Sequence, residues 1–388
     1  MVLDLVKKIG GRVSRLQTCL LILAGCCICG MANPVCKSGD IALASDGGLF
    51  LRKVGVDLYL GDMPFRAVGV NSIEIVHYFS IFGDTSLGEG LLRRAAEHGV
   101  KVIRYPAMHL GKRLIDLWRS EKELFWQGQD RLIQAAKKHG IQLIPSFMFV
   151  LYDFPSILQA SQEDLFVPGR PTNLLWKGFV GDFLARYRNE PTILMWEVAN
   201  ELNLYADRYP IYQFLTHRLV DEFIRDAVAF MHSVDPNHLV CSGNSAPAFD
   251  QAPTPEALAE EFVRVNKYVD VACIHTYPFA TAGSYYGISE AEYLAIMIKA
   301  SREILQIPVF IGEFGDDYRK NPRSPFCIEV FETALKHEVP LTMIWEWEVP
   351  KYDDFDNRQV YSVDPRVTPE MAEMVKEYAR RTAQAGQQ

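Results

Sequence analysis

The chain alternates between short apolar runs and longer segments in which apolar residues recur every three to four positions. The short runs predict strands that are buried on both faces, and the longer segments predict amphipathic helices. The predicted strands are 66–71, 102–105, 142–147, 192–200, 239–243, 271–277, 309–314 and 341–347. The predicted helices are 87–98, 123–139, 173–189, 211–233, 255–268, 290–305, 325–337 and 369–385.

This order of elements determines the predicted fold class. Strands that alternate with helices form a parallel sheet, and eight such units close the sheet into a barrel. A Gly-x-Gly-x-x-Gly turn, which would favour an open nucleotide-binding sheet, does not follow the first predicted strand. We therefore predict an α/β fold: a single-domain (β/α)8 TIM barrel over residues 49–388. Residues 49–60 alternate in polarity around Gly55 and predict a short N-terminal β-hairpin.

The first 32 residues have the pattern of a targeting leader. Basic residues precede an apolar stretch at 16–32 that is short for a membrane span. Two processing signals remain open, and an uncleaved anchor is the third alternative. Leu23-Ala24-Gly25-Cys26 resembles a lipoprotein signal that would leave Cys26 lipidated, and Gly30-Met31-Ala32 suits an ordinary secretory peptidase. We expect a secreted or periplasmic protein, anchored to the outer membrane by lipid in the first case, with a short linker at 33–48.

The amino-acid composition of the chain excludes several classes of function. The chain has 388 residues, of which 49% are hydrophobic and 23% charged, so it can bury a sizeable core. Its net charge of −8 argues against nucleic acid or an anionic membrane surface as a partner. Outside the leader, the cysteines match no zinc spacing and leave any disulfide open; they are Cys36, Cys241, Cys273 and Cys327.

Two of the apolar runs carry a glutamate near their end. They are Trp196-Glu197-Val198-Ala199-Asn200-Glu201 and Ile311-Gly312-Glu313-Phe314-Gly315. Burying an unpaired charge is costly, so we expect Glu201 and Glu313 at the open ends of strands, on the edge of a cleft. Two carboxylates that face one cleft are the minimum apparatus for hydrolysing a glycosidic bond.

Further polar and aromatic residues lie at the same strand ends, where barrel enzymes place their functional groups. They are Asn71, Arg104, Asn200, His275, Tyr277 and Trp345. The ordered set of Arg104, Asn200-Glu201, His275-Thr276-Tyr277, Ile311-Gly312-Glu313-Phe314 and Ile344-Trp345 resembles glycoside hydrolase family 5, within the clan of retaining (β/α)8 glycosidases. The resemblance covers nearly the whole chain from about Leu49.

The resemblance implies a role for each position. Glu201 would be the general acid/base and Glu313 the nucleophile, with no metal or organic cofactor. The substrate-binding residues would be Arg104, Asn200, His275, Tyr277, Trp345 and Asn71. Within this set, Asn200 would hydrogen-bond the sugar 2-hydroxyl, and Trp345 would lie under the sugar ring. We expect Glu313 to stay ionised and Glu201 to hold a proton near neutral pH. We expect Glu197 deeper in the barrel.

Two departures from the family pattern affect the predicted substrate. The segment 145–149 lacks the His that many members carry after the third strand, and Leu202 stands where many have Pro. The phrase before Glu201 resembles the mannanase branch. We expect a monomer that acts on β-1,4-linked polysaccharide or oligosaccharide, first mannan or glucomannan in the manner of an endo-β-mannanase. A cellulase or β-glucanase, and a non-catalytic glycan-binding lipoprotein, are the alternatives.

Overall fold

The computed structural model describes residues 49–386 apart from 109–111, 207–213, 279–284 and 350–359. The predicted leader and linker, with Cys26 and Cys36, lie outside the described residues. Among the helices that are described, none combines the length and apolar character that crossing a membrane requires.

Eight strands form one parallel sheet in the order β8-β7-β6-β5-β4-β11-β10-β9. A parallel bridge between Cys241 and Val271 joins the two ends of this order. The strands are β4 (Ala67–Asn71), β5 (Val102–Pro106), β6 (Gln142–Ser146), β7 (Met195–Glu197), β8 (Leu239–Cys241), β9 (Ala272–Thr276), β10 (Val309–Phe314) and β11 (Leu341–Ile344). The predicted TIM barrel is confirmed.

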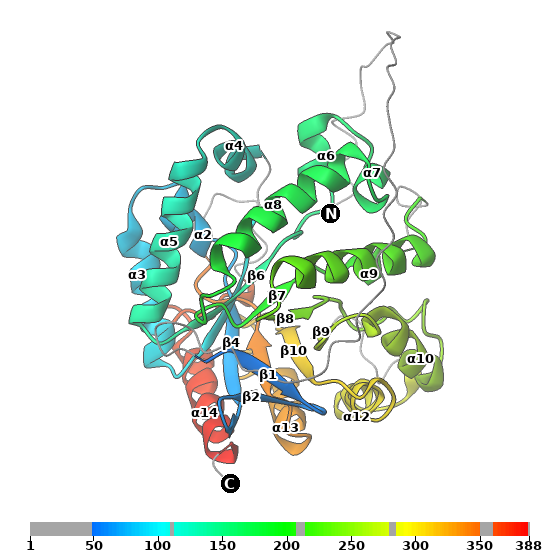
Figure 1. The fold of residues 1–388 in the computed structure, drawn as a ribbon. Coiled ribbons are helices and arrows are strands. Elements are labelled where there is room, and N and C mark those ends of the chain that lie inside the picture. The colour runs from blue at the N-terminus through cyan, green and yellow to red at the C-terminus, as the bar shows by residue number, and fades with distance from the viewer. Residues whose placement is uncertain (1–48, 109–111, 207–213, 279–284, 350–359, 387–388) are drawn as a thin grey trace, which may run out of the picture. The chain divides into compact units, whose positions relative to one another are not determined.

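The outer helices surround these strands (Figure 1). They are α3 (Thr85–Glu97), α5 (Lys122–Lys138), α8 (Pro171–Tyr187), α9 (His217–Val234), α10 (Pro255–Asn266), α12 (Glu290–Lys299) continued by η3 (Ala300–Leu305), α13 (Pro325–Lys336) and α14 (Pro369–Ala385). Each matches a predicted helix. Further short helices were not predicted; they are α2 (Ile75–Ser80), α4 (Lys112–Ser120), α6 (Asp153–Leu158), α7 (Glu163–Phe166) and η1 (Leu202–Leu204).

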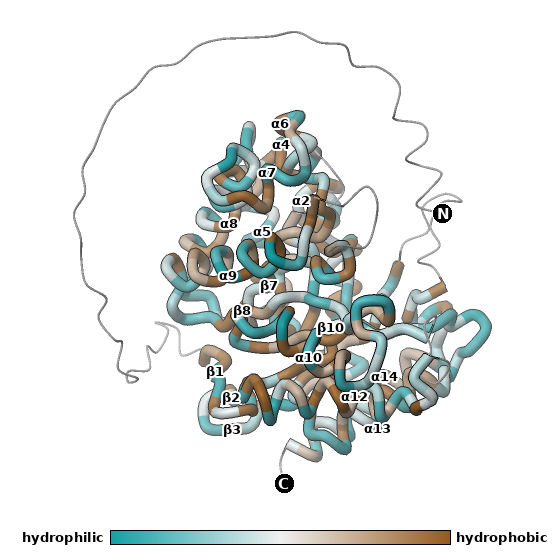
Figure 2. The backbone as a smooth tube through the Cα atoms, turned by 90° about the vertical axis from the view of Figure 1, so that its right-hand side faces the viewer, coloured by the Kyte–Doolittle hydropathy of each residue, from teal (hydrophilic) through white to brown (hydrophobic). Residues whose placement is uncertain are grey.

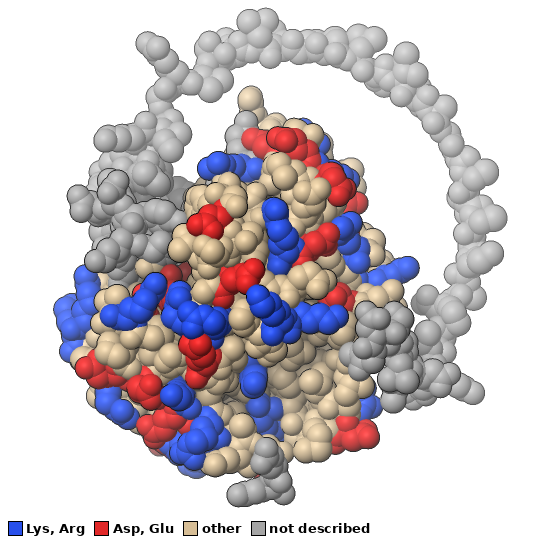
Figure 3. Space-filling view, turned by 90° about the vertical axis from the view of Figure 1, so that its left-hand side faces the viewer, with Lys and Arg blue, Asp and Glu red and all other residues tan. Residues whose placement is uncertain are grey.

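The helices bury one face each, as their sequence period predicts. In α9 the buried positions include Val220, Phe223, Ile224, Ala227 and Met231, which recur at intervals of one helical turn. Polar and apolar colours accordingly alternate along the outer helices (Figure 2). On the face shown in Figure 3, basic and acidic side chains are interspersed. Exposed ion pairs such as Lys138–Glu89 join neighbouring helices.

The predicted hairpin packs under the barrel. β1 (Leu51–Val54) and β2 (Asp57–Leu60) pair antiparallel, and a third strand, β3 (Met63–Pro64), extends the predicted hairpin. Leu51 and Leu58 are buried in one cluster with side chains from the first residues of several barrel strands, such as Val102 and Leu341. The hairpin therefore closes the N-terminal end of the barrel and leaves the opposite end for chemistry.

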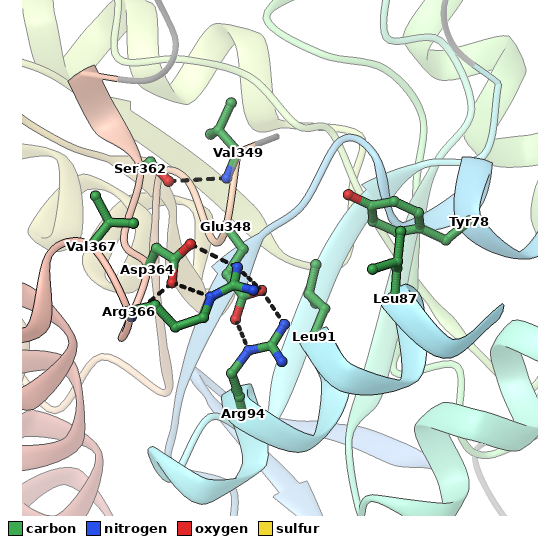
Figure 4. A pocket seen from close by; sticks show the side chains of 10 residues that line it. All are labelled: Tyr78, Leu87, Leu91, Arg94, Glu348, Val349, Ser362, Asp364, Arg366 and Val367. Atoms are coloured by element: carbon green, nitrogen blue, oxygen red, sulfur yellow. Dashed lines mark hydrogen bonds and ion pairs between the residues drawn. The ribbon is translucent and has the colours of Figure 1, made fainter. Parts of the chain in front are cut away.

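A cavity of about 300 Å³ lies between α3 and the chain that follows β11 (Figure 4). Its lining residues are Tyr78, Leu87, Leu91, Arg94, Glu348, Val349, Ser362, Asp364, Arg366 and Val367. The Glu348 carboxylate accepts hydrogen bonds from Arg94 Nε at 2.6 Å and from Arg366 at 3.1 Å. Arg366 also donates to Asp364 at 2.8 Å. This ion network fixes the chain three residues beyond Trp345.

Glu348→Ala should lower the free energy of unfolding by about 3 kcal/mol, because it leaves Arg94 largely buried without its carboxylate partner. Urea denaturation followed by circular dichroism measures the loss. Arg218→Ala is the control, because its pair with Glu222 is exposed and should be worth less than about 1 kcal/mol. Equal midpoints for the two variants would contradict a structural role for the network.

Candidate active site

Glu201 is positioned by an unusual backbone after β7. Predicted strand 192–200 forms regular pairs only at Met195–Glu197, after which the chain bends toward its neighbours. The Asn200 amide donates to Met148 O at 2.8 Å, and the Glu201 amide donates to Gly243 O at 2.8 Å. Glu201 then adopts φ +54°, a left-handed conformation that costs about 1–3 kcal/mol for a residue other than glycine. The surrounding hydrogen bonds hold this strained residue at the strand end.

Close backbone packing at Gly243 makes that arrangement possible. Gly243 has φ +71°, and a Cβ atom there would lie 1.9 Å from Ala199 O and 2.6 Å from the Glu197 carboxyl carbon. Only glycine fits this contact. The sequence signal was present, since a glycine ends the predicted strand 239–243, but its role in supporting Glu201 was not predicted.

Glu313 lies on β10 next to an irregularity in the sheet. The pairing of β10 with β9 shifts register between Ile311 and Glu313. Such bulges redirect a side chain. Gly312 permits the bulge to approach β9, because a Cβ atom there would lie 2.6 Å from Cys273 Sγ. The Glu313 side chain is buried, with 5% of its surface exposed.

The barrel brings Glu201 and Glu313 together, although 112 residues separate them in the chain. A carboxylate oxygen of each and a ring nitrogen of His275 all lie within 4.8 Å of one another. His275 Nδ1 is 3.0 Å from Glu201 Oε1 and 3.5 Å from Glu313 Oε1. Retaining glycosidases place their carboxyl groups about 5–5.5 Å apart, so this spacing fits that class.

The buried Arg104 side chain connects the residues of the site by hydrogen bonds. Its Nε and Nη2 atoms each donate to Glu197 at 2.7 Å, and Nη2 also donates to Asn200 Oδ1 at 2.7 Å. Nη1 donates to Asn71 Oδ1 at 2.9 Å and to Glu313 Oε1 at 2.5 Å. All five N–H donors of the guanidinium are thereby used. Glu197 lies fully buried in this polar cluster, as predicted.

Two of the residues predicted to bind substrate are buried. The Arg104 side chain has no exposed surface, and all its donors serve protein groups. Asn71 is 1% exposed, and its amide donates to Gly312 O at 2.9 Å and to Ile344 O at 3.3 Å. Both residues therefore position the carboxylates, and their contact with substrate stays a prediction.

The other predicted residues lie at the same strand ends. Tyr277 Oη donates to Glu313 Oε2 at 2.8 Å, so Arg104 and Tyr277 each hold one oxygen of this carboxylate. Asn200, Tyr277 and Trp345 are partly exposed, whereas His275 is buried. The Trp345 amide donates to Phe314 O, and its carbonyl accepts from Tyr318 Oη at 3.0 Å. These contacts fix the Trp345 backbone beside Glu313.

The environments of the two carboxyl groups shift their pKa values in directions opposite to the expected ones. Burial acts to raise the pKa of Glu201, but the hydrogen bond and charge of His275 and the charge of Arg104 lower it below the ordinary value. Burial, aided by the charge of Glu201, raises the pKa of Glu313 despite His275 and Arg104. His275 contributes to this difference, because its Nδ1 lies nearer to Glu201 than to Glu313.

The trio of Glu201, His275 and Glu313 is also of a composition that can ligate a divalent metal. The Arg104 guanidinium already occupies one side of Glu313, and its positive charge opposes a second cation at that carboxylate. The donor set therefore fits a proton-transfer site better than a metal centre.

Comparisons with known proteins agree with this geometry. Residues 184–325 match a family model described as GH family 5 beta-mannosidase-like. Mannan endo-1,4-beta-mannosidase 7 of Arabidopsis thaliana is 26% identical over 320 residues, which cover 74% of this chain and 72% of the relative. Mannan endo-1,4-beta-mannosidase 1 of Oryza sativa subsp. japonica is 24% identical, with 94% and 92% covered.

A solved endo-1,4-beta-mannanase from Rhizomucor miehei shares the fold with TM-score 0.67 at 16% identity, over 86% of this chain and 99% of that one. The barrel with two adjacent carboxylates at its strand ends defines the class of (β/α)8 glycoside hydrolases. The chain is therefore similar to glycoside hydrolase family 5, in agreement with the resemblance seen in the sequence.

Gly243→Ala should abolish most activity and destabilise the fold, because the added methyl group would collide with the Ala199 carbonyl that precedes Glu201. The matched control is Gly140→Ala. Gly140 also has positive φ, +66°, but a Cβ atom there meets nothing within 4 Å. The control should lose only about 1–2 kcal/mol for the backbone conformation and keep its activity. Thermal unfolding and initial rates on both variants test this, and similar losses in both would contradict the steric account.

Proposed function

We propose that this enzyme is a retaining, endo-acting β-mannanase that cleaves β-1,4-linked mannan or glucomannan by double displacement. The observation that carries the mechanism is the proximity of Glu201 and Glu313, within reach of one sugar carbon. The names of the curated relatives, which are mannan endo-1,4-beta-mannosidases, support mannan as the substrate ahead of cellulose or another β-glucan.

In the first step, Glu313 attacks carbon one of the sugar while Glu201 protonates the departing glycosidic oxygen. Arg104 and Tyr277 hold the attacking carboxylate by one hydrogen bond to each oxygen. In the second step, Glu201 takes a proton from water, which attacks carbon one and releases Glu313. The two steps together retain the configuration at carbon one.

The proton on Glu201 has to be supplied by substrate binding. In the protein alone, the hydrogen bond and charge of His275, with the charge of Arg104, favour the charged form of Glu201. The Glu201 side chain is still 21% exposed, so a sugar chain seated against it displaces water, and this further desolvation raises the pKa of the carboxyl group. The charge of Glu313 raises it further until the glycosyl–enzyme bond forms. The charge then disappears, and Glu201 becomes the base that the second step requires.

We also propose that the enzyme is a monomer that acts outside the cytoplasm, as a secreted or periplasmic protein or through a lipid anchor at Cys26. The support is the basic-then-apolar pattern of residues 1–32 and the lipoprotein-like phrase that ends at Cys26. Metabolic labelling with a radioactive fatty acid separates the two routes, because only the lipoprotein incorporates label, and Cys26→Ser removes it.

Glu201→Ala and Glu313→Ala should fail in different ways on an aryl β-mannoside with a good leaving group. Glu201→Ala should still form the glycosyl-enzyme, because such a leaving group departs without protonation, but should lose about 10²–10⁴-fold in rate on mannan. Glu313→Ala should be inactive on every substrate. Rapid-quench kinetics of aryl alcohol release measure both, with the exposed Glu303→Ala as the control that keeps full activity.

The reverse pattern would mean that the two roles are exchanged. Full activity in both variants would place the chemistry elsewhere. Binding of mannan by the unaltered chain without any hydrolysis would favour the glycan-binding alternative.

A further inference from the structure

Phe149 lies at the catalytic centre, yet the mechanism above does not use it. It follows β6, within the segment that departs from the family pattern, and it is partly exposed. Its ring centroid lies 5.4 Å from Arg104 Cζ and 6.2 Å from the ring centroid of Trp345. The phenyl and indole planes are within 11° of parallel. One side chain thus touches both the buried cation and the expected sugar platform.

The contact between Phe149 and Arg104 follows from the hydrogen bonding of Arg104. Its five N–H donors lie in the guanidinium plane and are all taken, so only the flat faces remain for a neighbour. An aromatic ring over a guanidinium face is attracted to it and keeps water away. Excluding water strengthens the hydrogen bonds of Arg104 to Glu197 and Glu313.

The contact with Trp345 bears on the substrate. Phe149 and Trp345 are near-parallel and both partly exposed, so together they expose more apolar surface than the indole alone. A phenyl ring accepts the C–H face of a sugar, but it offers no partner to a hydroxyl group, which would lose its hydrogen bond to water there. Phe149 therefore favours a sugar that turns its C–H face toward this side of the cleft.

We propose that Phe149 is a substrate-binding residue that extends the Trp345 platform for the sugar at the cleavage point. The inference rests on the proposed hydrolase function and deepens it, because it assigns part of the sugar specificity to a residue with no polar group. Phe149→Tyr preserves the ring, Phe149→Leu preserves only the apolar cover over Arg104, and Phe149→Ala removes both.

The first experiment compares KM and kcat of each variant on mannotetraose. The second combines each variant with Glu313→Gln and measures the dissociation constant of mannotriose by calorimetry. Loss of one aromatic contact should weaken sugar binding about three- to tenfold in Phe149→Leu and Phe149→Ala. Phe149→Tyr should bind like the parent. Tyr152→Ala, on the same loop but with 53% of its surface exposed, controls for the loss of a ring from this segment and should bind unchanged.

Unchanged mannotriose binding in Phe149→Leu and Phe149→Ala would overturn the proposal. So would a loss of kcat and thermal stability without any loss of binding, which would assign Phe149 to the support of Arg104 alone. Failure of the unaltered chain to hydrolyse mannotetraose would contradict the proposed function instead, and the calorimetric comparison would still decide the role of Phe149.

Discussion

The site depends on one buried cation. Transfer of the Arg104 guanidinium from water to the barrel centre is costly, and only a complete set of charged and hydrogen-bonded partners compensates for it. Those partners are Glu197, Glu313, Asn200 and Asn71, which come from strands or strand ends far apart in the chain. The barrel has to close correctly for all of them to meet Arg104. Correct closure of the barrel therefore also places Glu313.

This arrangement also suits a reaction in which one carboxylate temporarily loses its charge. Glu197 is buried, has two hydrogen bonds to Arg104, and is not exposed to a sugar. When Glu313 forms an ester, Glu197 still neutralises the guanidinium, so the cation is never left buried without a counter-charge. His275 Nδ1 lies within 3.5 Å of a carboxylate oxygen of both Glu201 and Glu313. The catalytic pair can thus change charge without disrupting the core beneath it.

The barrel was predictable because strands buried on both faces are continuous apolar runs, and the helices between them repeat every 3.6 residues. The pair Glu201 and Glu313 was predictable because a glutamate in such a run needs an open strand end. Helices as short as α6 and α7 were missed, since one turn or two give no clear period. The burial of Arg104 and Asn71, and the order of pKa values at Glu201 and Glu313, depend on side-chain distances that strand patterns do not encode. Phe149 has no polar group, so the polar residues at the strand ends did not point to it.

The central claim is that Glu201 and Glu313 act in turn on one sugar carbon, on opposite sides of a covalent intermediate. The stereochemistry of the first product tests it most directly. Proton NMR during the first minutes of mannotetraose hydrolysis, before the anomers equilibrate, should show the β-anomer at the newly formed reducing end. Initial appearance of the α-anomer would mean that water attacks carbon one in a single step, and it would contradict the account.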